Sequence, residues 1–472
     1  MSEFTPTPFD SLIQPNSDIA ANIGEFRAPR ILIVTDNASE IIPLRTHLKR
    51  LNYDVQIAFY NGTKLSSTPK KPPVAIIVNL TSFNERSEDI CTVLKQHYAS
   101  QPIPMIGVLD KVRQKETSNF DSVVIGPSHA SQIANRVNSF IRLSAMETEI
   151  TLRFETLQKD FGQPGFLQDT GDRSPFRVLF IGKATAAFMV VINALQMKNV
   201  EVVAAFTSFS AFDYLHDSDF DAVVMNALEQ AEPALSISQT MRRNARLYHV
   251  PTLFLVDETS FDYADKAYES GARDIIDIHA ETEEISGRII ELANYHRLHS
   301  ELKQGFESLG GHVCITPHSQ CYNHNFMDRH SERVVRSCHN AHQPVAFMAL
   351  KLLPDCSEPP LADNVISAIA DIGQMLKNLV RMQDTVSHYH ADTYLMSLPN
   401  TNAYEASIVL ERMKALVDCT AYESGIPNTA LSFSIEASYV EVEPHETSFL
   451  AIGRLFNQLN NMPYTHERQI IA

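Results

Sequence analysis

The arginine and the aspartate of Arg381-Met382-Gln383-Asp384 have the types and the spacing of a ligand-binding pair. The guanidinium of an arginine is a rigid, planar group of N–H donors that matches the acceptor edge of a flat ring or a phosphate. A carboxylate accepts hydrogen bonds from N–H groups. Residues three apart around a turn can face the same ligand. The alternative is an exposed surface pair, and we interpret a second copy of the pattern, Arg86 to Asp89, in that way.

A short polar turn follows this pair and carries one further acid. The segment Thr385–Pro399 alternates like two strands of a hairpin, with Asp392 near its tip. His388 and His390 lie two apart on the first strand, so both would face the same side. We interpret these two histidines as hairpin surface and not as metal ligands.

Seven cysteines and histidines crowd the segment 314–339, which raises the question of a zinc site. They are Cys314, His318, Cys321, His324, His330, Cys338 and His339. His318 and His324 have H-x₅-H spacing, but no C-x₂₋₄-C pair accompanies them. We therefore predict no metal site, and neither a glycine-rich phosphate loop nor a nucleophile–base pair stands out.

The elements that precede these residues follow a layout that occurs twice. Apolar runs at Arg30–Asn37 and Pro73–Leu80 are repeated about 147 residues later at Phe176–Lys183 and Phe220–Ala227. Continuous Val/Ile runs separated by helical stretches predict a parallel sheet covered on both faces, and the repetition indicates an internal duplication. The expected fold class is α/β, with two flavodoxin-like, doubly wound domains.

Each copy ends in a long helical pattern with apolar residues at three- and four-residue steps. The first stripe runs from Phe140 to Leu157 and the second from Ile285 to Leu309. Such stripes pack on their own domain or on a partner helix. Dimerisation through them is therefore one of two open interpretations.

The last 160 or so residues have a different pattern, in which strands and helices do not alternate regularly. A strand is expected at Pro344–Leu353, a helix at about Leu361–Val380, and then the hairpin. A second helix at Tyr404–Val417 and a strand at Ala430–Val442 follow. This order predicts an α+β domain built on a mixed sheet.

Composition limits the classes of function. The chain has 472 residues, 44% hydrophobic and 20% charged, with a formal net charge of −17 that argues against broad nucleic-acid binding. The first ~28 residues are rich in proline and polar residues, like a flexible tail, and lack the pattern of a signal peptide. With six cysteines and no apolar run long enough for a bilayer, we expect a cytoplasmic protein without disulfides.

Two consecutive receiver-like units followed by this α+β domain resemble PleD-type response regulators, whose third domain is a GGDEF diguanylate cyclase. The resemblance covers nearly the whole chain after the tail and looks closest to the PopA-type members, which act as cyclic di-GMP effectors. It implies a tail at 1–28 and degenerate receivers at 29–165 and 175–310. A degenerate GGDEF domain would occupy 311–472.

The resemblance implies that neither receiver accepts a phosphoryl group. Receivers use an aspartate after the third strand, an acid pair that holds Mg²⁺, a hydroxyl and a lysine. In the first copy these positions are Asn79, Thr35–Asp36, Leu109 and Gly126, and in the second Asn226, Gly182–Lys183, Val256 and Ile278. An amide is a poor nucleophile and one carboxylate is a weak Mg²⁺ site, so both copies should be insensitive to phosphate.

The cyclase positions are also altered. The GGDEF segment becomes His390-Ala391-Asp392-Thr393-Tyr394, and leucines, Leu350 and Leu352, stand where the strand should supply a second metal-binding acid. The entry motif of the family survives only as a trace around Thr316–Asn325, with Asn323 retained. Because phosphoryl transfer depends on metal ions and positioning, we expect no cyclase activity and no catalytic residue.

The allosteric product site of the family is R-x-x-D, five residues before the GGDEF position, and Arg381 and Asp384 match it in type and spacing. The family role implies that Arg381 contacts the guanine edge or a phosphate and that Asp384 accepts from the guanine N1–H and amino group. Arg412 aligns with the arginine that completes the ligand cage.

The resulting hypothesis is a non-catalytic cyclic di-GMP effector or scaffold of two-component type, without cofactor. By resemblance it would be a homodimer that recruits protein partners, such as adaptor or protease-delivery factors, at the cell pole during the cell cycle. A ligand-independent scaffold is the alternative, and residual diguanylate cyclase activity is the third.

Overall fold

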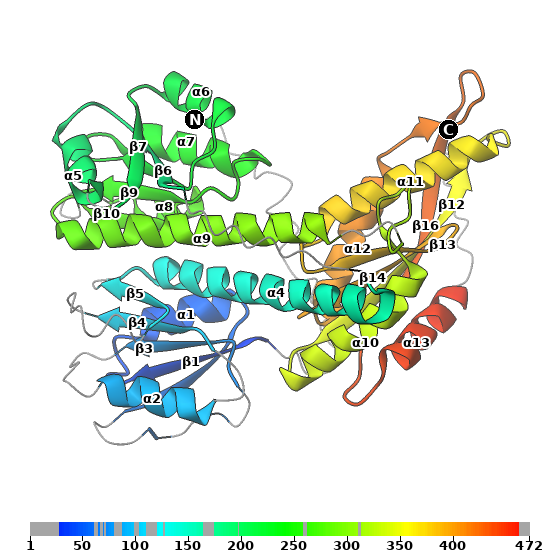
Figure 1. Ribbon diagram of the computed structural model, residues 1–472, viewed down its shortest axis with the longest axis horizontal. Helices are drawn as coiled ribbons and strands as arrows, with labels where there is room; N and C mark the ends of the chain where they lie inside the picture. The colour runs from blue at the N-terminus through cyan, green and yellow to red at the C-terminus, as the bar shows by residue number, and fades with distance from the viewer. Residues whose placement is uncertain are drawn as a thin grey trace, which may run out of the picture. The chain divides into compact units, whose positions relative to one another are not determined.

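The computed structural model describes residues 28–60, 65–66, 69, 72–79, 87–98, 103–109, 120–125, 128–163, 174–196, 198–257, 262–309 and 313–461 (Figure 1). The tail predicted at 1–28 lies outside these ranges except for its last residue. Among the described residues, one compact unit lies within 29–150 and 174–308, and the other within 151–163 and 309–461. The domain boundaries predicted near residues 28, 165–175 and 310 fall on or beside residues outside the described ranges and stay predictions.

The first sheet has five parallel strands in the order β2-β1-β3-β4-β5. Its strands are β1 (Arg30–Thr35), β2 (Asp54–Phe59), β3 (Ala75–Asn79), β4 (Met105–Leu109) and β5 (Ser122–Ile125). Helices α1 (Ile42–Arg50) and α4 (Ala130–Phe161) cover one face, and α2 (Ser87–His97) covers the other. Consecutive β1 side chains alternate between these two cores, and the strand order is that of a flavodoxin-like sheet, as predicted.

The second sheet repeats this order as β7-β6-β8-β9-β10. Its strands are β6 (Phe176–Ile181), β7 (Val200–Ala205), β8 (Ala222–Asn226), β9 (Thr252–Val256) and β10 (Asp274–Asp277). On one face lie α5 (Ala186–Leu195) and α9 (Thr282–Ser308), and on the other α6 (Ser208–Asp217), α7 (Ala231–Arg243) and α8 (Ala264–Glu269). The predicted duplication is therefore confirmed at the level of topology.

A buried group of charges joins the two copies within their compact unit. Arg136 on α4 contacts Asp274 on β10 at 2.9 Å and Glu291 on α9 at 3.2 Å, and Arg136 and Asp274 are 7% and 0% exposed at their side chains. Burial alone would lower the pKa of Arg136, but the two carboxylates outweigh it and raise that pKa. Burial would raise the pKa of Asp274, and Arg136 lowers it instead. Arg136 and Asp274 are therefore both ionised at neutral pH.

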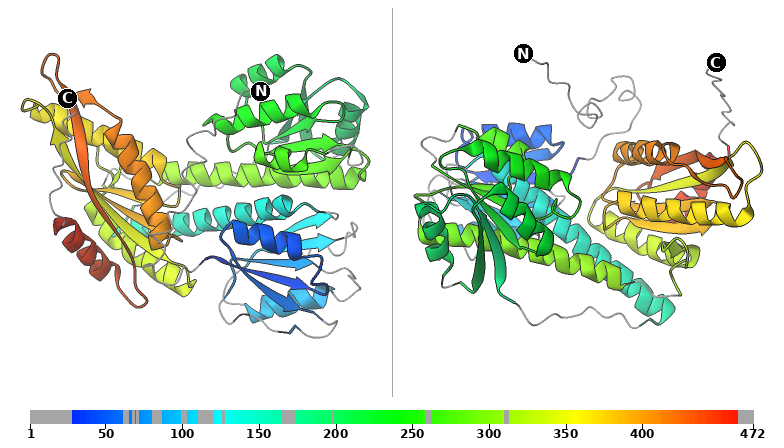
Figure 2. Two further views of the ribbon diagram at one scale, coloured as in Figure 1. Left: turned by 180° about the vertical axis from the view of Figure 1, so that it is seen from behind. Right: turned by 90° about the horizontal axis from the view of Figure 1, so that it is seen from above.

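The third sheet is mixed and has the order β11-β13-β14-β12-β16-β15. Its strands are β11 (Tyr322–Asn323), β12 (Val345–Asp355), β13 (Thr385–His390), β14 (Thr393–Pro399), β15 (Tyr422–Glu423) and β16 (Ala430–Glu441). Helices α11 (Ala362–Leu379) and α12 (Ala403–Asp418) cover one face, and α10 (His324–Asn340) and α13 (Ser448–Asn460) cover the other (Figure 2). Along β12, Ala346, Met348 and Leu350 enter the first core and Val345 and Phe347 the second. The domain is therefore built on a mixed sheet, as expected, and has a core on each face of it.

The last turns of α4 belong to the compact unit of the mixed sheet. Leu152 packs against the core under α10 and α13, and the ring of Phe161 lies 6.3 Å from that of Phe326. Asp160 pairs with Arg333 at 2.5 Å.

Although α4 and α9 are the longest helices, no helix within the described ranges combines the length and hydropathy needed to cross a membrane.

Candidate functional site

The segment Arg381–Asp384 forms a closed turn between α11 and β13. The backbone N–H of Asp384 donates to the carbonyl of Arg381 at 3.0 Å, and Asp384 Oδ2 accepts the backbone N–H of Arg381 at 2.9 Å. Asp384 is 7% exposed, whereas Arg381 is exposed. The carboxylate therefore shapes the turn, and the turn presents the guanidinium of Arg381 at its surface.

Arg412 lies beside this turn. It belongs to α12, and its Nη2 donates to the carbonyl of Leu379, the last residue of α11. A cation at the C-terminal end of a helix satisfies a carbonyl that has no partner inside the helix and interacts favourably with the helix dipole. Because Val380 is extended and ends the helix, Leu379, the turn and Arg412 come together at one end of α11.

A third arginine, which the sequence did not suggest, also reaches this turn. Nη2 of Arg153, near the end of α4, lies 3.2 Å from the carbonyl oxygen of Met382 and 2.8 Å from that of Asp384. Its distance to Thr385 Oγ1 is 3.0 Å. The contact to Asp384 joins residues 231 positions apart, so no local pattern could have indicated it.

The segment His390–Tyr394 lies where β13 turns into β14. The ladder is irregular between His388 and His390, and His388 Nε2 lies 3.2 Å from the carbonyl oxygen of Ala391. Asp392 Oδ1 accepts a hydrogen bond of 2.7 Å from the hydroxyl of Thr393. His388 is stacked on Tyr394, with 4.7 Å between ring centroids. The turn is therefore held by its own side chains.

The strand opposite this turn offers apolar side chains. Leu350 pairs with Tyr394 in the ladder, and the backbone N–H of Leu352 donates to the carbonyl of Asp392 at 2.8 Å. Both leucine side chains are fully buried in the core shared with α11 and α12. The two leucines thus act as core residues, and of these three positions only Asp392 carries a carboxylate.

Asn323, which the resemblance compares with the entry motif, has a structural role. Its side-chain oxygen accepts from the backbone N–H of Phe326 and caps α10. Its amide nitrogen donates to the carbonyl of Val313 at 2.8 Å. Asparagine is among the residues preferred for capping a helix start, so this residue has a structural role at its position.

In the receiver-like copies the asparagines end the third strand, as predicted. Asn79 is the last residue of β3, beside Thr35 of β1, and Asn226 is the last residue of β8. Asn226 accepts the backbone N–H of Leu228 at 3.1 Å. Gly182 has φ +147°, and a Cβ there would lie only 2.5 Å from that of Asn226, so this glycine leaves room for the asparagine.

The other receiver positions carry no acid pair. Thr35 is fully buried and Asp36 is exposed, whereas Lys183 Nζ pairs with Glu229 at 2.5 Å. Leu109 and Val256 are buried at the ends of β4 and β9, and Ile278 follows β10. Gly126 lies outside the described residues.

The cysteines and histidines between residues 314 and 339 are mostly core residues. Cys314, Cys321 and His330 are almost fully buried. Burial raises the pKa of both cysteine thiols to about 11, which favours the protonated form over the thiolate that a zinc ion needs. The sequence-based prediction of no zinc site here stays a prediction that this chemistry supports.

A second group of possible metal ligands was not predicted from the sequence. Within the described ranges, one group of potential ligand atoms gathers within 4.8 Å, from Asp257, Asp277 and His279 at the carboxyl ends of β9 and β10. A metal ion accepts such carboxylate and imidazole donors. Exposed acidic groups are also common on surfaces without an ion, so the trio by itself assigns no site.

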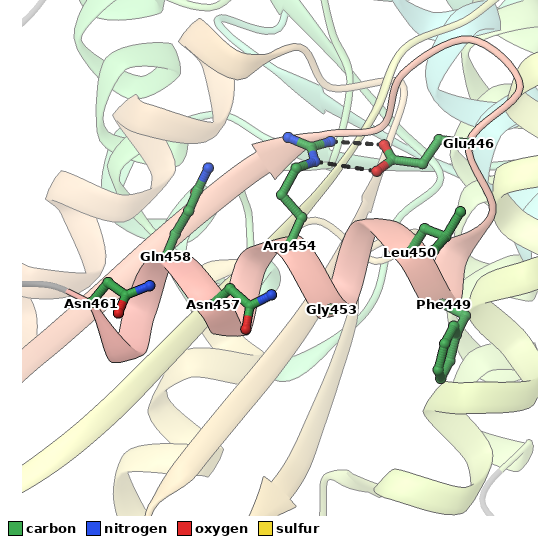
Figure 3. Close-up of a pocket in the computed structure, with 8 residues that line it drawn as sticks. All are labelled: Glu446, Phe449, Leu450, Gly453, Arg454, Asn457, Gln458 and Asn461. Atoms are coloured by element: carbon green, nitrogen blue, oxygen red, sulfur yellow. Dashed lines mark hydrogen bonds and ion pairs between the residues drawn. The ribbon is translucent and has the colours of Figure 1, made fainter.

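A hollow of about 660 Å³ lies along α13 (Figure 3). Phe449, 83% exposed, and Leu450 stand at one end, and Arg454 forms two hydrogen bonds to Glu446, of 3.2 and 2.7 Å. The hydrogen bonds to Glu446 raise the pKa of Arg454, so this pair stays ionised. The hollow contains no residue of the turn at 381–384.

No protein-family model matches the chain. The chain is 20% identical over 432 residues to the response regulator PleD of Caulobacter vibrioides. The aligned region covers 88% of this chain and 94% of PleD.

Solved structures match single parts of the chain. The GGDEF domain of DgcB from Caulobacter crescentus, solved in complex with c-di-GMP, is 13% identical and covers 32% of this chain and 87% of its own, with a TM-score of 0.28. A putative response regulator from Chloroflexus aurantiacus is 18% identical and covers 25% of this chain and 98% of its own, with a TM-score of 0.24.

Proposed function

We propose that this chain is a non-catalytic effector that binds cyclic di-GMP at the turn Arg381–Asp384, with Arg412 as a second cation. The observation that carries the proposal is the turn itself: an exposed guanidinium is held on a fixed backbone, and a second guanidinium lies at the adjoining helix end. A ligand with two phosphates and two guanines can use both arginines. Two cations placed together create a local field that suits an anion despite the net charge of −17.

The proposed lack of cyclase activity rests on the hairpin and its neighbouring strand. Two-metal phosphoryl transfer needs several carboxylates around the ions. Here Asp392 faces a strand whose corresponding positions are Leu350 and Leu352, both buried in the core. A leucine at such a position cannot rotate out without leaving a cavity. The domain therefore supports ligand binding better than turnover.

Calorimetric titration of cyclic di-GMP into the full chain tests the proposal. We expect saturable heat with the wild type and at least a tenfold weaker affinity for Arg381→Ala, because a charge-assisted hydrogen bond contributes about 1.5–3 kcal/mol. Arg86→Ala, in the other R-x-x-D copy, is the matched control and should bind like the wild type. Absence of heat from the wild type, or equal affinities of wild type and Arg381→Ala, would support the ligand-independent scaffold instead.

Residual diguanylate cyclase activity is tested separately. Incubation with GTP and Mg²⁺ followed by chromatography should yield no cyclic di-GMP. Turnover that disappears in Asp392→Ala would contradict the non-enzyme assignment, because Asp392 is the acid retained at the metal-binding position of the hairpin.

The proposal extends to the receivers and to partners. With Asn79 and Asn226 at the acceptor positions, acetyl phosphate should leave the mass of the intact protein unchanged. Cytoplasmic location, recruitment of protein partners such as adaptor or protease-delivery factors, homodimerisation and placement at the cell pole in the cell cycle belong to the same proposal. Fluorescence imaging of the tagged chain and affinity capture with and without cyclic di-GMP test these parts.

A further inference from the structure

Arg153 is an interior cation at the end of the first receiver's long helix. It is 6% exposed and its guanidinium lies over the ring of Tyr322, with 5.5 Å to the centroid. Its Nη2 approaches two main-chain carbonyls of the ligand turn, at 3.2 and 2.8 Å. An arginine is costly to bury, and this one is held by groups whose positions define the shape of the turn.

The turn is therefore fixed from two sides. Inside the turn, the carboxylate of Asp384 accepts the backbone N–H of Arg381. From α4, the guanidinium of Arg153 contacts the backbone carbonyls of the turn. Loss of either contact lets the peptide groups rotate, and the direction in which Arg381 leaves the backbone changes with them. If Arg381 is not held in one direction, ligand binding must order it, and the entropy lost in doing so lowers the affinity for the ligand.

We infer that Arg153 is a positioning residue for the cyclic di-GMP turn, and that ligand binding and the seating of the α4 end on the mixed-sheet domain stabilise each other. The inference rests on the proposed function and adds to it a regulatory partner inside the chain. Coupling of this kind is reciprocal: if the seated helix end improves binding, then ligand must hold the helix end in place by the same factor.

The same helix end offers a matched control. Arg333 on α10 pairs with Asp160 of α4 at 2.5 Å, and its other hydrogen bonds among the described residues reach Thr156 of α4 and the carbonyl of Arg329 in its own helix, not the turn. Arg333→Met should therefore loosen the helix end without altering the turn directly. Arg153→Met removes the contacts to the turn. Arg153→Lys keeps the positive charge but loses the planar guanidinium that contacts two carbonyls.

The experiment combines hydrogen exchange with calorimetry on the full chain. In Arg153→Met without ligand, we expect the amides of residues 381–385 to exchange at least tenfold faster, with affinity for cyclic di-GMP reduced about tenfold. Arg153→Lys should fall between this variant and the wild type. Arg333→Met should speed exchange in residues 151–161 and, through the coupling, should speed exchange of residues 381–385 and lower affinity by clearly less than Arg153→Met does. Ligand should slow exchange of residues 151–161 in the wild type.

The possible outcomes test the positioning role of Arg153 separately from the binding of cyclic di-GMP. Unchanged turn exchange and affinity in Arg153→Met, or equal losses of affinity in Arg153→Met and Arg333→Met, would overturn the positioning role. If the wild type gives no heat with cyclic di-GMP, the proposed function and the coupling fail. The hold of Arg153 on the turn is then still decided by the exchange of residues 381–385. Should Arg153→Met not fold, Arg153→Lys provides the same comparison.

Discussion

Asp384 combines a structural contact with the role expected of it in ligand binding. Its carboxylate accepts the N–H of Arg381 at 2.9 Å and is shielded from solvent, while the arginine three residues earlier is exposed. The aspartate thus preorganises the backbone from which the arginine extends. The two residues of the pattern should therefore respond differently to substitution, although the sequence alone treats them as equivalent.

Asp384→Ala should lower both the stability of the mixed-sheet domain and its affinity for cyclic di-GMP. The turn would lose a buried acceptor of a backbone N–H, which costs about 1–3 kcal/mol of unfolding free energy. Arg381→Ala should lower affinity but change stability by less than about 0.5 kcal/mol, as for other exposed residues. Urea denaturation and titration calorimetry of both variants measure the difference. Equal losses of stability would contradict this division of roles.

Two histidines beside the second receiver sheet should make the protein sensitive to acid. Burial, followed by charges including Arg142, lowers the pKa of His249 to about 4, and burial with the neighbouring His249 lowers that of His299 to about 3. The unfolded chain binds these protons below about pH 6.5, before the folded chain does, so stability falls as pH falls from 6.5 towards 4. Urea midpoints at pH 7 and 5 should differ, and His299→Gln should reduce the difference. An unchanged difference in His299→Gln would be evidence against this cause.

At the scale of elements, the hairpin depends on a close contact with α11. Tyr394 on β14 is fully buried, and its hydroxyl donates to the carbonyl of Ile369 at 2.8 Å. A Cβ on Gly373 would collide with the Tyr394 ring, 2.7 Å from its Cζ. The turn at His390–Tyr394 is thus held by packing of Tyr394 under α11.

Gly373→Ala should destabilise the mixed-sheet domain by about 1–3 kcal/mol, because the added methyl group overpacks the contact with Tyr394. Gly453→Ala in α13 is the matched control. A Cβ there meets nothing within 4 Å, and alanine is the better helix former by about 1 kcal/mol. Thermal or urea denaturation should therefore move in opposite directions in the two variants. A shift of the same sign in both would show that the contact with Tyr394 does not limit stability.

At the scale of the whole molecule, the duplicated receivers use corresponding residues to form one compact unit. Arg136 and Arg288 are each the seventh residue of α4 and α9, and both approach Asp274, at 2.9 and 3.9 Å. Ser122 and Asp274 each begin the fifth strand of their copy. The charged face formed by this strand and helix is therefore occupied within the chain. Dimerisation through the long helices stays a prediction that must use other surfaces.

Arg136→Met should destabilise the two-receiver unit by about 3–5 kcal/mol, because Asp274 would remain buried with a weakened set of partners. Arg246→Met is the control, since Arg246 pairs with Asp219 at 3.0 Å on the surface, where both side chains are more than half exposed. Its loss should cost less than about 1 kcal/mol. Scanning calorimetry of the full chain measures both. Equal costs would contradict the importance of the buried charges.

Local patterns were sufficient to predict most elements of the mixed-sheet domain. The helix expected at Leu361–Val380 is α11, Ala362–Leu379, and the strand expected at Ala430–Val442 is β16, Ala430–Glu441. Helices α10 and α13 were not predicted. In α10 the apolar positions are interrupted by histidines and charges, so its buried face is recognisable only once the sheet beneath it is in place.

The sequence by itself determined the two parallel sheets, the mixed sheet and the side-chain types at Asn79, Asn226, Leu350 and Leu352, because side-chain type and short-range periodicity are properties of the chain alone. Only the tertiary structure decided that Asp384 turns inward, that Arg412 lies at the end of α11 and that Arg153 holds the turn from outside. These contacts join segments far apart in the chain, and packing, which no local spacing encodes, determines which of them meet.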